Sequence, residues 1–129
     1  MKKRTKSQQA LIKAAKDCFW KYGIKKVTVE EICDTAGVSK MTYYRSFANK
    51  MEIAETVLTD IIKTGEDAFD EIMERNIDFP QKIKGVVLLE HEYSKGISQD
   101  FISDIINNED KELKLLMANA NQRGQEKLI

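Results

Sequence analysis

Residues 28–47 read TVEEICDTAGVSKMTYYRSF, two short helical patterns joined at Gly37. Thr28 and Glu31 predict a capping box, in which a hydroxyl and a carboxylate each pair with a backbone N–H at the start of a helix. Apolar residues then recur at helical spacing as far as Ala36. Gly37 ends this helix, because a residue without a Cβ adopts the left-handed conformation at little steric cost. Ser39 is a second good N-cap, so the segment predicts a helix-turn-helix.

The second helix of this motif has one apolar and one polar face. Apolar residues, chiefly Tyr43 and Phe47, fold it back onto the first helix. The N-terminal part of such a helix reaches base edges in the major groove, which makes Lys40 and Met41 the best candidates for base contacts. Side chains at helix starts and the Tyr44 hydroxyl suit phosphates instead. The candidate DNA-binding residues are Thr28, Ser39, Lys40, Met41, Thr42, Tyr44, Arg45 and Lys50.

The alternative is a simple helical hairpin, in which Tyr43, Tyr44 and Phe47 all pack inward and the cations are solvated. Charge distribution favours the DNA-binding interpretation. The chain has 21 basic and 21 acidic residues, but residues 1–50 hold twelve basic and four acidic ones, a net charge of +8. Residues 51–129 carry the balancing −8. A basic module of this kind releases counterions from a phosphate backbone. The cations Lys2, Lys3, Arg4 and Lys6 predict a mobile arm that adds non-specific attraction to DNA.

Helical patterns fill the rest of the chain, so the predicted fold class is all-α. One amphipathic helix is expected over about 6–22, ended by Gly23. A long helix follows, capped by Asn49 and Glu52 and reaching about residue 74. Further helices are expected at about 80–95, opened by Pro80, at about 98–107 and at about 109–127. The side chain of Trp20 lies off the apolar stripe of its helix, so it either packs on the second module or stays partly exposed.

Other functional classes have little support in the sequence. Cys18 and Cys33 lie on apolar helix faces without Cys-x-x-Cys spacing, and His91 is the single histidine, so we expect reduced thiols, no metal and no cofactor. No nucleophile–base pair or Gly-rich phosphate loop is present, which argues against an enzyme. No apolar run approaches a membrane span, and the N-terminus lacks an apolar signal region, so we expect a cytoplasmic protein with no membrane partner.

The sequence of residues 8–58 resembles the N-terminal domain of TetR-type (TetR/AcrR-like) transcriptional regulators. The matching residues are Ile12, Ala14, Ala15, Phe19, Gly23, Thr28, Val29, Ile32, Ala36, Gly37, Val38, Ser39, Thr42, Tyr44, Phe47, Lys50 and Val57. The resemblance implies a three-helix DNA-binding head over 1–48, then a linking helix and a helical effector and dimerisation domain over 49–129. It also implies a homodimer on a palindromic operator in double-stranded DNA, released by a small-molecule effector. Cys33, Met41 and Ser46 depart from the family pattern.

Such regulators usually continue through two more long helices, so we expect that this chain holds an incomplete C-terminal domain. Two functional hypotheses follow. The first is a sequence-specific, ligand-released repressor. The second is a helical interaction protein that dimerises with a longer relative and modulates its DNA binding. The candidate effector-pocket residues are Phe69, Met73, Val87, His91, Tyr93 and Phe101.

Overall fold

The described part of the chain is entirely helical in its regular structure. The computed structural model describes residues 3–107, 110, 111, 113–115, 117 and 118. Its helices are α1 (Lys6–Tyr22), α2 (Val29–Ala36), α3 (Lys40–Ser46), α4 (Lys50–Glu74), α5 (Phe79–Tyr93) and α6 (Gln99–Ile106). The all-α prediction is confirmed, and the predicted helix ends agree to within two residues. The helix expected over 109–127 falls largely outside the described residues, although those of its residues that are described from 111 onward are helical.

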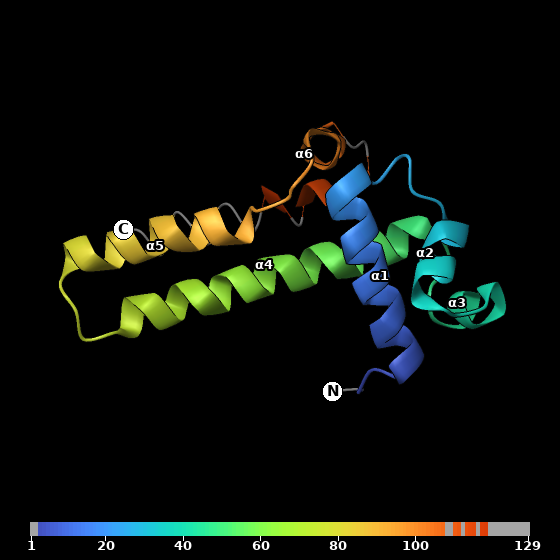
Figure 1. Cartoon of the computed structure of the whole chain (residues 1–129), viewed down its shortest axis with the longest axis horizontal. Helices are drawn as coiled ribbons and strands as arrows, with labels where there is room; N and C mark the ends of the chain where they lie inside the picture. Colours follow the sequence, from blue (N-terminus) through green and yellow to red (C-terminus); the bar gives the residue numbers. More distant parts are fainter. Residues whose placement is uncertain (1–2, 108–109, 112, 116, 119–129) are drawn as a thin grey trace.

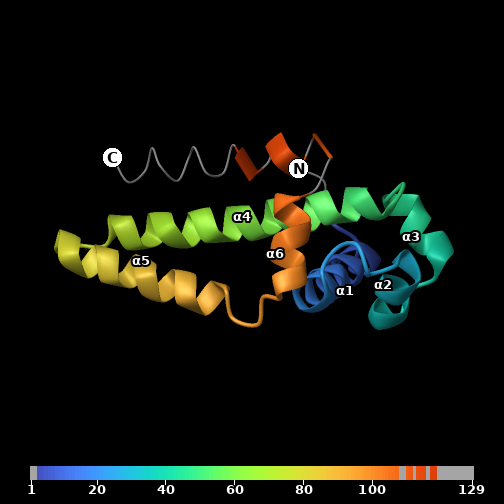
Figure 2. The same cartoon turned by 90° about the horizontal axis from the view of Figure 1, so that it is seen from above.

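The helices form a head and a body joined by α4 (Figure 1). The short helices α1, α2 and α3 gather at one end, which we call the head. From there α4 runs for 25 residues, about 38 Å at 1.5 Å per residue, and α5 returns beside it. In Figure 2, α6 crosses the molecule where head and body meet, and it packs against α1. Helix α1 therefore contacts α2 and α3 within the head and also α4 and α6 outside it.

A continuous apolar core holds the head on the first turns of α4. Fully buried side chains come from every head helix, among them Phe19 of α1, Ile32 of α2 and Tyr43 of α3. Ile53 and Val57 of α4 belong to the same cluster. Each such side chain contributes on the order of 1.5–3 kcal/mol when it leaves water. The orientation of the head therefore follows that of α4.

The caps expected from the sequence are present, with one difference. The Thr28 hydroxyl accepts the Glu31 backbone N–H at 3.1 Å, as predicted. The Glu31 carboxylate, however, accepts a hydrogen bond from that hydroxyl at 3.2 Å, and the structure shows no bond to the Thr28 backbone N–H. The reciprocal half of the predicted capping box is therefore wrong. Gly37 has φ 70° and ψ 34°, the predicted left-handed conformation.

Trp20 packs on the body and is half-buried there, so both alternatives that its off-stripe position left open hold in part. Its indole N–H donates to the carbonyl oxygen of Lys95 at 2.8 Å, and its own carbonyl accepts the Ser98 backbone N–H at 3.0 Å. The indole ring also lies against Phe101 of α6, with the ring centroids 5.3 Å apart. Head and body are thus joined by hydrogen bonds as well as by apolar contact.

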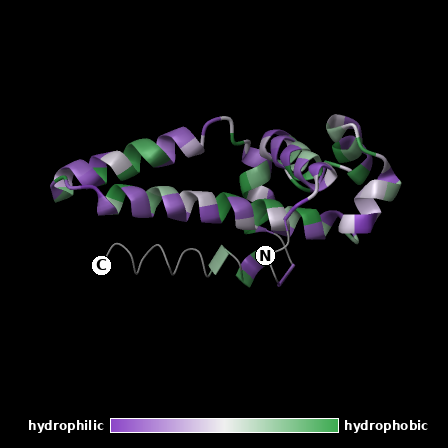
Figure 3. Cartoon of the chain, turned by 90° about the horizontal axis from the view of Figure 1, so that it is seen from below, coloured by the Kyte–Doolittle hydropathy of each residue, from purple (hydrophilic) through white to green (hydrophobic). Residues whose placement is uncertain are grey.

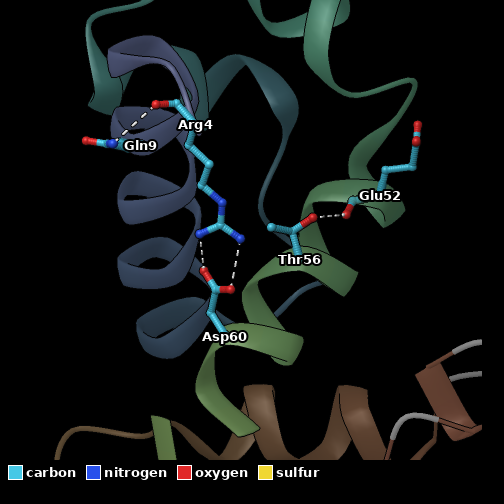
Figure 4. Close-up of polar contacts among 5 residues, drawn as sticks. All are labelled: Arg4, Gln9, Glu52, Thr56 and Asp60. Atoms are coloured by element: carbon cyan, nitrogen blue, oxygen red, sulfur yellow. Dashed lines mark hydrogen bonds and ion pairs between the residues drawn. The ribbon is translucent and has the colours of Figure 1, made fainter. Parts of the chain in front are cut away.

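Two of the four cations expected in a mobile arm, Arg4 and Lys6, belong to the folded structure, while Lys2 lies outside the described residues. Arg4 makes a bidentate ion pair with Asp60 of α4, with N–O distances of 2.7 and 2.9 Å, and Gln9 donates to the Arg4 carbonyl (Figure 4). The hydrogen bond to Asp60 raises the pKa of Arg4. Lys6 is the first residue of α1. Arg4 and Lys6 therefore belong to the folded head.

The body is less well buried than the head. No residue of α5 is fully buried, and Figure 3 shows hydrophobic stretches along this helix between hydrophilic ones. Phe79 and Val87 are 61% and 59% exposed. Among the described helices, none combines the length and apolar character that crossing a membrane requires.

Candidate nucleic-acid interface

The outer face of α3 presents a mixed polar and apolar surface. Met41 is 70% exposed and Tyr44 is 53% exposed, whereas Tyr43 between them is fully buried. Lys40 and Arg45 are exposed on the same helix. The inward packing of Tyr44 that the hairpin alternative expected is therefore wrong, whereas its solvated Lys40 and Arg45 are present. A short helix with one buried and one exposed face is the geometry that groove reading requires.

Buried contacts fix the orientation of this helix. The Tyr43 hydroxyl donates to the carbonyl oxygen of Asn49 at 2.8 Å, which ties α3 to the start of α4. Burial raises the pKa of Tyr43 well above its ordinary value. The Tyr43 ring also meets the Tyr44 ring edge-on, with centroids 5.1 Å apart. The exposed tyrosine is thus supported by the buried one.

Local hydrogen bonds order the N-terminal end of α3. The Ser39 hydroxyl accepts the Thr42 backbone N–H at 3.1 Å and donates to the Thr42 hydroxyl at 3.0 Å. At the other end, the Arg45 guanidinium lies 3.7 Å from the Met41 sulfur. These contacts limit the freedom of the exposed side chains before any ligand arrives.

Lys40 is paired within the motif. Its ammonium forms an ion pair with the carboxylate of Glu30 on α2, and both side chains are exposed. This hydrogen bond lowers the pKa of Glu30 and raises that of Lys40. The best candidate for a base contact therefore has an acidic competitor beside it.

Lys50 and Thr28 lie away from α3, at the starts of α4 and α2. The Lys50 ammonium donates to the carbonyl oxygens of Ile24 at 2.8 Å and Lys25 at 3.1 Å. An ammonium has three N–H donors, so two are used in this way and one is left. Five of the candidate residues thus lie on α3, with Ser39 as its N-cap, whereas Thr28 caps α2 and Lys50 begins α4; the five are Lys40, Met41, Thr42, Tyr44 and Arg45.

A separate cavity of about 700 Å³ lies where the head meets the body. Of the six candidate effector-pocket residues, Phe69 and Tyr93 line it, and Met73, Val87, His91 and Phe101 do not. Val87 is exposed on α5, whereas Phe101 is buried against Trp20. Lys16, Asp17 and Trp20 of α1 line the cavity too, and the sequence interpretation did not include them. The off-stripe position of Trp20 was the signal that could have found this contribution from the head.

The described residues show no basis for a metal site. No group of three or more His, Cys, Asp or Glu side chains within them is arranged to hold a metal ion. Both cysteines are free thiols, Cys33 buried and Cys18 half-buried. Burial raises the pKa of the Cys33 thiol.

The sequence of the head is similar to that of a known protein family. Residues 11–57 match the family model described as bacterial regulatory proteins, tetR family. Over these residues the head is similar to the N-terminal domain of the TetR family. The family model describes regulatory proteins, which agrees with the expectation that the chain is not an enzyme.

The curated relatives are longer than this chain. The uncharacterized HTH-type transcriptional regulator YhgD of Bacillus subtilis is 27% identical over 88 residues, which cover 68% of this chain and 46% of YhgD. The HTH-type transcriptional regulator TtgR of Pseudomonas putida is 32% identical over 69 residues, 50% of this chain and 33% of TtgR. The chain therefore spans at most about half of each of these relatives.

The fold agrees with that of a solved regulator. The ketosteroid transcriptional regulator KstR2 of Mycobacterium tuberculosis superposes with a TM-score of 0.72 and 18% sequence identity, covering 97% of this chain and 65% of KstR2. At this identity the similarity shows the fold alone. It extends beyond the head, into the body that the family model does not cover.

Proposed function

We propose that this chain is a sequence-specific DNA-binding transcriptional regulator whose helix α3 enters the major groove. The observation that carries the proposal is the exposed surface of Lys40, Met41 and Tyr44 on a helix that is fixed from behind by buried Tyr43. Rigid elements position reading side chains better than mobile loops do. The net charge of +8 in residues 1–50 adds salt-dependent attraction to phosphate.

Each candidate residue has a role that fits its position. Lys40 is suited to donate to guanine O6 and N7, and Met41 to contact a thymine methyl. Thr42 and Arg45 are the next candidates for base contacts. Tyr44, Thr28 and Lys50 would contact phosphates, which fix the register on DNA without reading sequence. Ser39 caps α3 and so sets the direction of the residues that follow it.

Amide chemical-shift mapping of the isotope-labelled chain tests this assignment. We expect that a duplex taken from the DNA upstream of its own gene shifts the amide resonances of α3 and of the first residues of α2 and α4. Resonances of α5, which lies along the far part of α4, should stay unchanged and serve as the internal control. Shifts confined to α5, or none at all, would contradict the proposal.

We further propose that the regulator is a homodimeric repressor released by an apolar small molecule. Paired heads on a palindromic operator gain effective concentration, which a change in head separation removes. The cavity supports this hypothesis because it is lined by both head and body, so a ligand in it would contact Trp20 of α1 together with Phe69 and Tyr93. Such a ligand could bias the angle between the two parts.

Fluorescence tests the cavity directly, because Trp20 is the only tryptophan in the chain. We expect that N-phenyl-1-naphthylamine, a neutral apolar probe, quenches Trp20 emission saturably and that Phe69→Ala weakens this binding. Phe79→Ala is the matched control, since Phe79 is exposed on α5 and does not line the cavity. Equal weakening by both substitutions, or the absence of saturable quenching, would contradict binding in this cavity.

A specific observation favours a second candidate function. The exposed apolar side chains on α5, including Phe79, Val87 and Leu88, suit pairing with another chain. An interaction protein that dimerises with a longer relative would use such a face. Two measurements separate the regulator from the interaction protein. Light scattering gives the mass of the pure chain in solution, and co-purification from its own cells shows whether a longer partner binds it. A dimer that binds DNA alone supports the regulator, and a monomer that binds DNA only with a longer partner supports the interaction protein.

A further inference from the structure

Asp104 of α6 is a buried acidic residue that reaches into the head. Its side chain is 9% exposed, and among the described residues it is the one polar side chain in the buried class. One carboxylate oxygen, Oδ2, accepts the backbone N–H groups of Ile24 at 2.7 Å and Lys25 at 2.9 Å. Both residues lie in the loop between α1 and α2. Hydrogen bonds from backbone N–H groups to a carboxylate are among the stronger ones in proteins.

Lys50 contacts the same loop through its carbonyl groups. Its ammonium donates to the carbonyl oxygens of Ile24 and Lys25. The Ile24 carbonyl and the Lys25 N–H belong to one peptide group. That peptide group therefore donates to the Asp104 carboxylate and accepts from the Lys50 ammonium. Hydrogen bonds linked through one amide polarise each other, so the two contacts support one another.

Close packing at Gly23 makes this arrangement possible. A Cβ at residue 23 would lie 2.7 Å from Asp104 Oδ2 and 3.0 Å from the Cβ of Asp100. Gly23 also has φ 89°, a conformation that residues with a side chain rarely adopt. The end of α1 thus lets α6 approach the loop closely enough for its carboxylate to reach two N–H groups.

We propose that Asp104 is a positioning residue for DNA binding, acting through the Ile24–Lys25 peptide group to hold the Lys50 ammonium at the start of α4. This inference rests on the proposed function, in which the remaining N–H donor of Lys50 meets a phosphate. It assigns to α6 a hydrogen-bonded link to the phosphate-contacting surface, through the Ile24–Lys25 peptide group, in addition to its apolar contact with α1. A displacement of α6 would then alter a DNA contact without any change in α3.

A double-mutant cycle on DNA affinity tests the link. Asp104→Asn keeps the shape of the side chain but removes its charge, and Lys50→Met removes the ammonium. We expect that Asp104→Asn weakens binding to a labelled duplex by a factor on the order of three to ten, with a shallower salt dependence. In the Lys50→Met background the same change should cause no further loss, because coupled contacts are not additive.

Asp100→Asn is the matched control. It removes the same charge from the same helix, but its carboxylate forms an exposed ion pair with Lys26 at 3.3 Å and, among the described residues, no hydrogen bond to the Ile24–Lys25 loop. We expect it to leave the affinity unchanged or slightly raised. Equal effects of Asp104→Asn and Asp100→Asn on DNA affinity would overturn the inference. It would also be overturned if the double variant lost affinity by the product of the two factors measured for Asp104→Asn and Lys50→Met alone. Absence of salt-dependent DNA binding by the parent chain would instead overturn the proposed function.

A second measurement covers the case in which Asp104→Asn does not fold. Lys50→Met leaves the buried carboxylate in place, and we expect it to shift the Lys25 amide resonance because the same peptide group loses its ammonium partner. The amides of α5 serve as the reference for unrelated changes. A Lys25 amide that shifts no more than this reference would overturn the inference.

Discussion

The ammonium of Lys40 on α3 is paired with the carboxylate of Glu30 on α2, across the turn of the helix-turn-helix motif. Both side chains are more than half exposed, so water and salt screen the pair, and it adds little to stability. Its effect on ligand binding is different. A phosphate or a guanine edge that approaches Lys40 must compete with Glu30 and is also repelled by it.

Glu30→Gln should therefore strengthen DNA binding, because it removes the competitor of Lys40. We expect a gain of a few-fold at low salt that decreases as salt is added, since salt screens exposed charges. Titration by fluorescence anisotropy at two salt concentrations measures this. Asp34→Asn is the control, because it neutralises another exposed carboxylate of α2 that makes no ion pair with Lys40. An equal gain from both variants would mean that net charge alone, and not the ion pair, limits binding.

Substitutions on the interface should separate phosphate contacts from base contacts. We expect Tyr44→Phe and Lys50→Ala to weaken binding to the upstream duplex and to a scrambled duplex by similar factors. Lys40→Ala should also reduce the preference between the two, by about 1–3 kcal/mol if it loses a bidentate base contact. Anisotropy titrations with both duplexes measure these quantities. Unchanged affinity in all three variants would contradict the interface.

Much of the head was predictable because its signals are local. The caps at Thr28 and Ser39 and the left-handed Gly37 each depend on residues within three positions, and the structure confirms them. Contacts between distant parts of the chain were not predictable in this way. Nothing near Asp104 in the sequence indicates that it binds the loop some 80 residues earlier.

The same distinction explains the partial success with the cavity. Phe69 and Tyr93 line it, but an apolar residue of a helix faces a cavity or a core according to the packing of other helices. Phe101 was expected in the cavity and instead packs in the core beside Trp20. Periodicity finds the apolar face of a helix, but it does not show what that face meets.

Tyr43 should make the head sensitive to alkaline pH. Burial raises its folded-state pKa above the ordinary value of 10.0. Its stabilising contribution is therefore complete below pH 10 and is lost as pH rises from there toward the folded-state pKa, because only the unfolded chain ionises. Tyr43→Phe should cost about 1 kcal/mol at neutral pH for the lost hydrogen bond to Asn49 but flatten this alkaline loss. Urea unfolding at several pH values measures both effects, and identical alkaline slopes would contradict the assignment.

Gly23→Ala should destabilise the fold by about 2 kcal/mol or more, because it combines an unfavourable φ with a clash against Asp104. Gly65→Ala is the matched control. Gly65 lies within α4, and a Cβ there would meet no atom of the described residues within 4 Å beyond its own stretch of helix. We expect this change to stabilise the helix by about 0.5–1 kcal/mol. Urea unfolding followed by circular dichroism measures both, and a tolerated Gly23→Ala would contradict the close packing of α6 against the loop.

The central claim, that the head reads DNA sequence, is tested most directly by fluorescence-anisotropy titration of the whole chain against the DNA upstream of its own gene and a scrambled duplex of the same composition. Two salt concentrations separate phosphate attraction from base reading. The account predicts tighter binding to the upstream duplex, with both affinities falling as salt rises. Equal affinity for the two duplexes, or no binding to either, would contradict it.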